Sequence, residues 1–421
     1  MKYSVITFGC RVNQADSLGF EEELRAAGAV GVAPAEADVV VVNTCSVTAS
    51  ADQGARQLVR RVARDNPHAR VVMTGCYATR RPDEVGALPS VVRLIPNAEK
   101  QFLVPAIATE FGLTTAERFG GGAGSCGGAI GPGLAGRTSF TLCVQTGCAE
   151  SCAYCIIPAT RGRPRSLPIG RLVVEIDRVV AAGFKEIALS GVHLGSYGRD
   201  LTSPTSLLAL LRRVAAHEGD VLFRISSLEP MDCGRDVVDL VVGSGRFAPH
   251  FHLPLQHASD AVLARMRRPC TIAKYAALVD DIRARIPHAA IGSDVIVGFP
   301  GETDEDFERL ASYIERSPLT HVHVFPYSDR GGTAASTMGD KVPGALVRER
   351  AGRIRQIAHE LHVRFQASQI GTVHRGLTLE DGSLVVTGNY LKVRIPPGRV
   401  RNEWVRVKIA AEGEVMTGEI R

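Results

Sequence analysis

The sequence predicts an α/β protein in three parts: an N-terminal doubly wound α/β domain, a partial (βα)6 TIM-type barrel and a small C-terminal β-barrel. Apolar runs of strand length alternate with helical stretches over most of the 421 residues, which is typical of parallel sheets joined by helices. Glycines crowd residues 112–137 and indicate a linker between the two α/β parts. Residues 370–421 change to short strands broken by glycine and proline, which indicates an all-β domain.

The first domain, residues 1–111, is expected to contain the buried strands Lys2–Phe8, Ala37–Asn43 and Ala69–Thr74. Nearly continuous apolar runs occur where helices cover both faces of a parallel sheet. In residues 138–369 the alternation resumes for about six units, which form a partial barrel with its site at the C-terminal ends of the strands. The expected barrel strands are Phe140–Gln145, Glu186–Ser190, Leu222–Ser226, His250–Leu255, Ala290–Val297 and His321–Pro326. The expected strands of the last domain are Leu384–Thr387, Leu391–Ile395 and Trp404–Ile409.

The composition fits a large cytoplasmic enzyme. Hydrophobic residues make up 45% of the chain, which is ample for the cores of several domains. No segment has the form of a signal peptide or of a membrane span, so we expect no membrane partner and a cytoplasmic location. Ten cysteines in such a compartment indicate metal binding rather than disulfides. The net charge of +5 permits an anionic partner without requiring one.

Cys148, Cys152 and Cys155 lie within eight residues of one another. Iron–sulfur clusters are normally held by four cysteine thiolates, and three on one loop would leave one iron open for chemistry. The alternative is a zinc knuckle, which would require a fourth Cys or His close by. None lies between Cys155 and His193, so the spacing favours a reactive cluster.

A second set of cysteines is predicted from the first domain. Cys10, Cys45 and Cys76 each follow one of its expected strands. In an open parallel sheet, residues just beyond the carboxyl ends of the strands converge on one crevice. Gly9 and Gly75 would let the backbone turn closely around a bulky inorganic group. The alternative is three separate buried thiols, but their common placement favours a second cluster.

The spacing C-x3-C-x2-C resembles the signature of the radical S-adenosylmethionine (SAM) superfamily. The whole chain resembles the methylthiotransferases of that superfamily, which end in a small β-barrel of the TRAM type. The run Gly-Cys-Arg-Val-Asn-Gln at residues 9–14 and the segment Ser-Ser-Leu-Glu-Pro at residues 226–230 are most similar to the MtaB branch. Further matching segments are residues 155–158, 190–198, 294–303 and 325–328.

The resemblance implies that a methylthio group is added to C2 of N6-threonylcarbamoyladenosine at position 37 of tRNA, beside the anticodon. Two 4Fe-4S clusters and SAM would be the cofactors, and SAM would serve as methyl donor and as radical source. The cluster at Cys148, Cys152 and Cys155 would cleave SAM. An auxiliary cluster would be held by Cys10, Cys45 and Cys76. Residues at the ends of barrel strands would contact SAM: Ser190, Gly191, Val295, Ile296 and Gly298.

The implied partners are the anticodon loop of tRNA and an external electron donor such as a flavodoxin or ferredoxin. Phosphate contacts require cationic side chains, and Arg11 is a candidate partner for the carboxylate of the modified base. Tyr390 and Trp404 would add stacking. Basic residues gather in three groups: Arg56, Arg60, Arg61 and Arg64; Arg161, Arg163 and Arg165; and Arg394, Arg399, Arg401 and Arg406.

Two alternative functions remain open from the sequence. The enzyme could act on isopentenyladenosine 37 of tRNA or on a ribosomal protein. It could also be a non-catalytic iron–sulfur protein that binds RNA.

Glu302 either contacts SAM or caps the following helix. No role is assigned to the remaining cysteines, Cys126, Cys143, Cys233 and Cys270.

Overall fold

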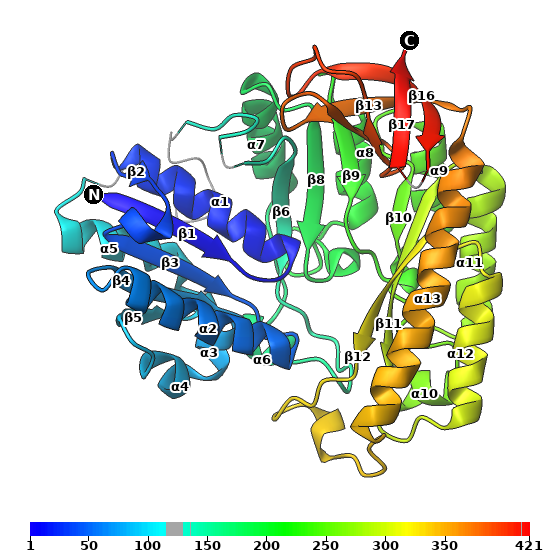
Figure 1. The fold of residues 1–421 in the computed structure, drawn as a ribbon, viewed down its shortest axis with the longest axis horizontal. Coiled ribbons are helices and arrows are strands. Elements are labelled where there is room, and N and C mark those ends of the chain that lie inside the picture. Colours follow the sequence, from blue (N-terminus) through cyan, green and yellow to red (C-terminus); the bar gives the residue numbers. More distant parts are fainter. Residues whose placement is uncertain (115–128, 135, 414) are drawn as a thin grey trace.

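The computed structural model describes residues 1–114, 129–134, 136–413 and 415–421. Cys126 and most of the expected glycine-rich linker lie outside the described residues. Figure 1 shows the N-terminal sheet domain, the strands and helices of the partial barrel, and the C-terminal β-barrel against the edge of the partial barrel. No helix among the described residues is long and apolar enough to cross a membrane.

The N-terminal domain is a parallel sheet in the order β2-β1-β3-β4-β5. Valines along β3 alternate between two hydrophobic clusters: Val39 and Val41 belong to one, Val40 and Val42 to the other. Helices therefore cover both faces, as in a doubly wound sheet. The elements are β1 (Lys2–Thr7), α1 (Arg11–Ala26), β2 (Val30–Gly31), β3 (Val39–Thr44), α2 (Ala49–Asp65), β4 (Arg70–Gly75), α3 (Cys76–Arg80), α4 (Pro82–Gly86), β5 (Val91–Ile95) and α5 (Leu103–Phe111).

The partial barrel consists of two hydrogen-bonded sheets, β7-β6-β8-β9 and β10-β11-β12. A parallel bridge between Ser227 and His252 connects them. The strands are β6 (Phe140–Thr146), β7 (Arg165–Ser166), β8 (Glu186–Gly191), β9 (Leu222–Ile225), β10 (His250–His252), β11 (Ala290–Val297) and β12 (His321–Pro326). The helices are α6 (Ile157–Arg161), α7 (Ile169–Ala181), α8 (Leu207–Ala215), α9 (Arg235–Gly243), α10 (Asp260–Arg265), α11 (Ile272–Arg285), α12 (Asp304–Arg316) and α13 (Gly344–Gln369).

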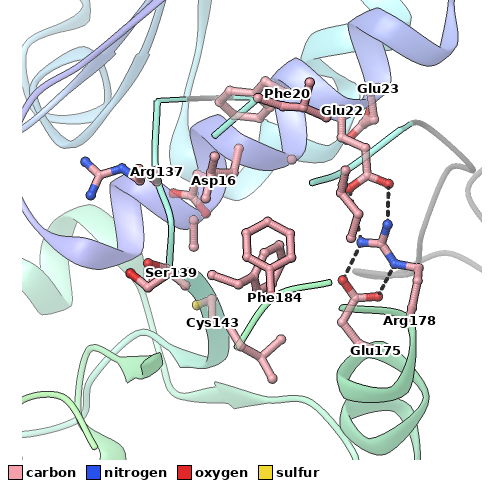
Figure 2. A pocket seen from close by; sticks show the side chains of 18 of the residues that line it. Asp16, Phe20, Glu22, Glu23, Arg137, Ser139, Cys143, Glu175, Arg178 and Phe184 are labelled. Atoms are coloured by element: carbon pink, nitrogen blue, oxygen red, sulfur yellow. Dashed lines mark hydrogen bonds and ion pairs between the residues drawn. The ribbon is translucent and has the colours of Figure 1, made fainter. Parts of the chain in front are cut away.

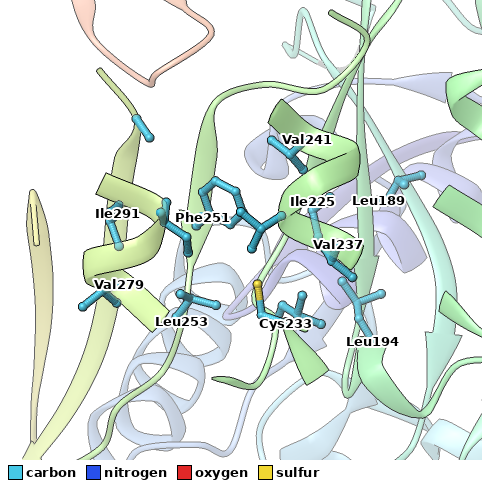
Figure 3. Close-up of a cluster of buried hydrophobic side chains, with 14 of the residues drawn as sticks. Leu189, Leu194, Ile225, Cys233, Val237, Val241, Phe251, Leu253, Val279 and Ile291 are labelled. Carbon is cyan, nitrogen blue, oxygen red and sulfur yellow. The ribbon is translucent and has the colours of Figure 1, made fainter. Parts of the chain in front are cut away.

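A continuous hydrophobic core lies between these strands and the helices outside them. Figure 3 shows Leu189, Ile225 and Phe251 from neighbouring strands facing side chains of the surrounding helices. Cys233 is part of this core and is 2% exposed. Burial of this apolar surface stabilises the strand positions, so the ends of the strands form a rigid frame for a site.

The C-terminal part is a closed barrel in the order β13-β14-β15-β17-β16. Its interior packs against Ala290 of β11 and Phe365 of α13, which fixes it to the partial barrel. The strands are β13 (Val373–Leu379), β14 (Leu384–Thr387), β15 (Lys392–Arg394), β16 (Trp404–Glu412) and β17 (Val415–Ile420). The predicted α/β fold with a small terminal β-barrel is confirmed; β2, β5, β7, β13 and β17 were not predicted.

Candidate active site

The N-terminal cysteines lie just beyond neighbouring strand ends. Thr7 of β1 pairs with Asn43 of β3, and Thr44 of β3 pairs with Gly75 of β4, so Cys10, Cys45 and Cys76 follow at one edge of the sheet. Burial raises the pKa of Cys45 to about 11, and the nearby charges of Cys76 and Cys10 also raise it. The three thiols are therefore close enough to interact electrostatically.

The surroundings of these thiols fit a bulky metal cluster. Gly9 has a φ of 91°, and a Cβ at this position would lie 2.6 Å from the Cys45 Sγ; only glycine permits this approach. N–H groups also point to the sulfurs. The Val47 amide nitrogen is 3.5 Å from the Cys45 Sγ, and the Asn97 Nδ2 is 3.6 Å from the Cys76 Sγ. Hydrogen bonds to sulfur are typical of iron–sulfur ligands.

The second cysteine group lies on the loop after β6. The loop is anchored to the barrel because Ala153 donates a hydrogen bond to the Met266 carbonyl (3.0 Å) and accepts one from Ala335 (2.7 Å). Burial raises the pKa of Cys155 to about 12, so a bound metal must supply the charge that makes this thiol a thiolate ligand.

Arg268 supplies a positive charge beside this loop. Its Nη1 lies 3.8 Å from the Cys152 Sγ and 3.1 Å from a carboxylate oxygen of Glu229. The guanidinium is held in place by that carboxylate and stabilises negative charge on the sulfur. The donor set of Cys148, Cys152 and Cys155 therefore fits an anionic cluster.

Helix α6 connects the two cysteine groups. Arg161, at its C-terminal end, binds the Asp16 carboxylate of α1 at 3.3 Å, and Asn97 donates to the Thr160 carbonyl at 2.8 Å. The Arg161 side chain is 4% exposed, so its predicted contact with tRNA phosphates is wrong. Its role is to join the loop of Cys148, Cys152 and Cys155 to the N-terminal domain.

A cavity of about 870 Å³ lies between the strands of the partial barrel and the terminal β-barrel. Residues from all three parts of the chain line it, among them Cys10 of the first domain, Ser190 and Gly191 of β8, and Tyr390 between β14 and β15. One cavity is therefore lined jointly by Cys10 of the N-terminal cysteine group, the barrel strands and the terminal barrel.

The other residues expected to contact SAM lie at different places. Ile296 packs against Ala153 in the cysteine loop. Val295 is fully buried in the main core, so its side chain is not placed for the expected contact with SAM. Gly298 donates its N–H to Glu302 at 2.8 Å, and a Cβ at Gly298 would lie 2.4 Å from Val347 of α13. The ligand contacts of Ser190, Gly191, Ile296 and Gly298 stay predictions.

Sequence reasoning named Arg11 and Tyr390 but missed the histidines that line the cavity. The Arg11 Nη2 donates to the Tyr390 hydroxyl at 2.8 Å. The Tyr390 ring stacks on His250 with 5.0 Å between the ring centroids, and His252 and His323 also line the cavity. The available signal was the pattern His-x-His in two strands, which places both imidazoles on one face.

A second, smaller cavity of about 210 Å³ lies where α1 meets β6 and α7. Figure 2 shows Phe184 and Cys143 facing it and Arg178 bound to Glu22 and Glu175. Burial raises the pKa of Cys143 to about 12, which makes it an unreactive packing thiol. This cavity belongs to the contact between the first domain and the barrel.

Comparison with known proteins shows the family to which the chain belongs. Family models match residues 2–96 (Uncharacterized protein family UPF0004) and residues 142–314 (Radical SAM superfamily). The chain is 34% identical to threonylcarbamoyladenosine tRNA methylthiotransferase MtaB of Aquifex aeolicus, over 97% of this chain and 100% of that protein. The chain belongs to the radical-SAM methylthiotransferase family. The MtaB protein of Bacillus subtilis is 32% identical over 92% of this chain and 88% of its own length.

Membership of the radical-SAM methylthiotransferases makes the protein an enzyme that transfers a sulfur-containing group with SAM and 4Fe-4S clusters as cofactors. Another relative is the tRNA-2-methylthio-N(6)-dimethylallyladenosine synthase of Clavibacter michiganensis, 34% identical over 86% of this chain and 70% of that protein. Among solved structures, the radical SAM methyltransferase TsrM of Kitasatospora setae matches with a TM-score of 0.56 and 15% identity, covering 80% of this chain and 74% of that one. This likeness concerns the fold alone.

Proposed function

We propose that this methylthiotransferase converts N6-threonylcarbamoyladenosine at position 37 of tRNA to its 2-methylthio derivative. The observation that carries the proposal is the cavity that Cys10 shares with Ser190, Gly191 and a polar wall of Arg11 and Tyr390. The threonylcarbamoyl group bears a carboxylate, a hydroxyl and a ureido group, whereas an isopentenyl group is hydrocarbon. A polar, cationic wall suits the former, because a buried carboxylate requires a partner.

The roles of the cysteines follow from their placement. Cys148, Cys152 and Cys155 would hold the cluster that binds SAM, and Cys10, Cys45 and Cys76 the auxiliary cluster. When bound, these groups supply a carbon radical that can attack an unactivated C–H bond and the sulfur that replaces the hydrogen. Helix α6 and Arg161 hold the two cysteine groups in a fixed relation, and Ser190 and Gly191 would orient SAM at the end of β8.

Arg11 is the proposed partner of the threonylcarbamoyl carboxylate. It lines the cavity, and its hydrogen bond goes to the neutral Tyr390 hydroxyl. A guanidinium held by a neutral group keeps its charge available for an incoming carboxylate, and such charge-assisted hydrogen bonds are strong.

The remaining partners are also proposals. Exposed arginines of the terminal barrel, Arg394 and Arg406, would contact tRNA phosphates. Trp404 is less suited to stack on a base, because the Arg375 guanidinium covers its ring at 4.0 Å. A flavodoxin or ferredoxin would supply electrons. Thiols that must stay reduced to bind iron support a cytoplasmic location.

An assay with purified tRNAs tests the substrate assignment. The reconstituted enzyme is given SAM, a reductant and tRNA that carries either threonylcarbamoyladenosine or isopentenyladenosine at position 37. We expect mass spectrometry of the nucleosides to show the methylthio product only for the threonylcarbamoyl form. Methylthiolation of the isopentenyl form instead would contradict the assignment. An Arg11→Met variant should raise KM for the threonylcarbamoyl tRNA, whereas Arg309→Met, an exposed arginine of α12, should not.

A further inference from the structure

Three strands of the barrel bring two imidazoles and a carboxylate to one place on the cavity wall. His252 ends β10, Asp294 lies on β11 and His323 lies on β12. The register pairs Asp294 directly with His323, and His252 with Gly292 two residues before Asp294. Because alternate residues of a strand share a face, these side chains point to the same side of the sheet. His252, Asp294 and His323 all line the large cavity.

The donor atoms of this group are already close together. The Asp294 Oδ1 lies 3.1 Å from the His252 Nε2 and 3.0 Å from the His323 Nδ1, and the three donor atoms lie within 4.8 Å of one another. Zinc bonds of about 2.0–2.2 Å in tetrahedral geometry separate ligand atoms by roughly 3.4 Å. Small rotations of the side chains would therefore give metal-binding geometry.

A third imidazole nearby, that of His321, is fixed in another role. His321 accepts or donates a hydrogen bond with Thr320 through Nδ1 at 3.0 Å. Its Nε2 lies against Gly292, where a Cβ would come within 2.0 Å of it. His321 therefore lies on the same face of the sheet, packed over Gly292 of β11, and the donor group consists of His252, Asp294 and His323.

We propose that His252, Asp294 and His323 bind one divalent first-row metal ion, with zinc or iron(II) the ions that this donor set suits. Two histidines and a carboxylate with open positions are a known arrangement for both ions. The His323 side chain is 60% exposed and that of His252 13%, so the open positions face the cavity. The ion would present a positive charge to an oxygen ligand of the substrate. The site does not depend on which adenosine is modified.

Zinc binding by the cluster-loaded enzyme tests this site. The protein is reconstituted anaerobically with iron and sulfide, so that the cluster cysteines are occupied, and then equilibrated with micromolar zinc. Zinc should displace iron(II) from a site with nitrogen ligands, as the usual order of metal affinities requires. We expect one zinc per chain by elemental analysis with no loss of cluster iron. X-ray absorption at the zinc edge should show nitrogen and oxygen ligands without sulfur.

Single variants assign the ligands. Asp294→Asn and His323→Ala should each weaken zinc binding by about tenfold or more. His323 is the safer position for folding because it is largely exposed. His217→Ala is the matched control, since His217 also binds an aspartate, Asp177, at 3.1 Å but lies outside the cavity. Zinc–sulfur bonds, loss of cluster iron on zinc binding, an unmodified enzyme that binds no zinc, or equal binding by wild type and His323→Ala would each overturn the proposal.

Discussion

At the scale of single residues, the two cysteine groups differ in how the protein prepares them for a cluster. Around Cys45 and Cys76, N–H groups of Val47 and Asn97 donate to the sulfurs, and the Arg161 charge acts on Cys45 without being its hydrogen-bond donor in these contacts. Beside Cys152 the neighbour is a full positive charge, Arg268. Hydrogen bonds and nearby charge both stabilise thiolate sulfur and shift the potential of a cluster. We therefore expect the two clusters to have different redox potentials.

Removal of the ligands should show two independent clusters. Full reconstitution should give about eight iron atoms per chain if both clusters are four-iron cubes. Replacing Cys148, Cys152 and Cys155 together by alanine should leave half the iron and abolish cleavage of SAM to 5′-deoxyadenosine. Replacing Cys10, Cys45 and Cys76 together should also leave half the iron. This variant should still cleave SAM but should form no methylthio product.

A half-buried cysteine that belongs to neither group, Cys270, provides the control for these variants. Cys270→Ser should keep the full iron content, because Cys270 belongs to neither cysteine group and its Sγ donates to the Thr271 carbonyl at 3.5 Å. Iron content is measured by colorimetric analysis after gel filtration. A complete loss of iron in either triple variant would rule out independent sites.

At the scale of elements, Glu302 connects the turn after β11 to the long helix α13. Its carboxylate accepts hydrogen bonds from the Gly298 amide at 2.8 Å and from the Arg350 Nη1 at 2.7 Å. The Glu302 side chain is fully buried. The expected capping role is wrong, because Thr303 caps the following helix α12; the buried Glu302 carboxylate holds the turn after β11 instead.

Removal of the buried arginine should destabilise the enzyme strongly. Arg350→Met leaves the Glu302 carboxylate buried without its main partner, which costs about 3–5 kcal/mol. At about 2–4 °C per kcal/mol the melting temperature should fall by roughly 10 °C. Arg353→Met, three residues away, breaks an exposed pair with Glu308 and should cost less than about 1 kcal/mol. Thermal denaturation followed by circular dichroism compares the two; similar melting temperatures would contradict the structural role of Glu302.

Most long strands could be predicted because they are buried on both faces and are bounded by glycine or polar residues. The unpredicted β2 (Val30–Gly31) and β7 (Arg165–Ser166) are short edge strands, where an apolar run is not required. Arg161 was misassigned because sequence does not distinguish an exposed arginine from one that joins two domains. His252, Asp294 and His323 were missed because only the strand register brings them together.

At the scale of the whole molecule, the exposed arginines of the terminal barrel should determine how tRNA binding depends on salt. Replacing Arg394, Arg399 and Arg406 together by glutamine should weaken tRNA binding and lower the slope of log affinity against log salt by about 2. SAM cleavage should not change. The control replaces exposed arginines of α12 and α13, Arg309, Arg316 and Arg353, and should leave the slope unchanged. Gel shifts at several salt concentrations measure the affinity for tRNA and its dependence on salt. If the slope for the Arg394, Arg399 and Arg406 variant equals that of the wild type, the tRNA contacts lie elsewhere.

The hydrogen bond between Arg11 and Tyr390 joins residues that are 379 positions apart in the chain. One wall of the cavity is therefore formed jointly by the first α/β domain and the small β-barrel. In a chimera that receives only the terminal barrel of a relative, Arg11 would stay, but the relative's residue would replace its partner Tyr390. Recombination of whole domains should then yield folded but poorly active hybrids. Redesign of the base specificity would require coordinated changes in the first and the last segments of the chain.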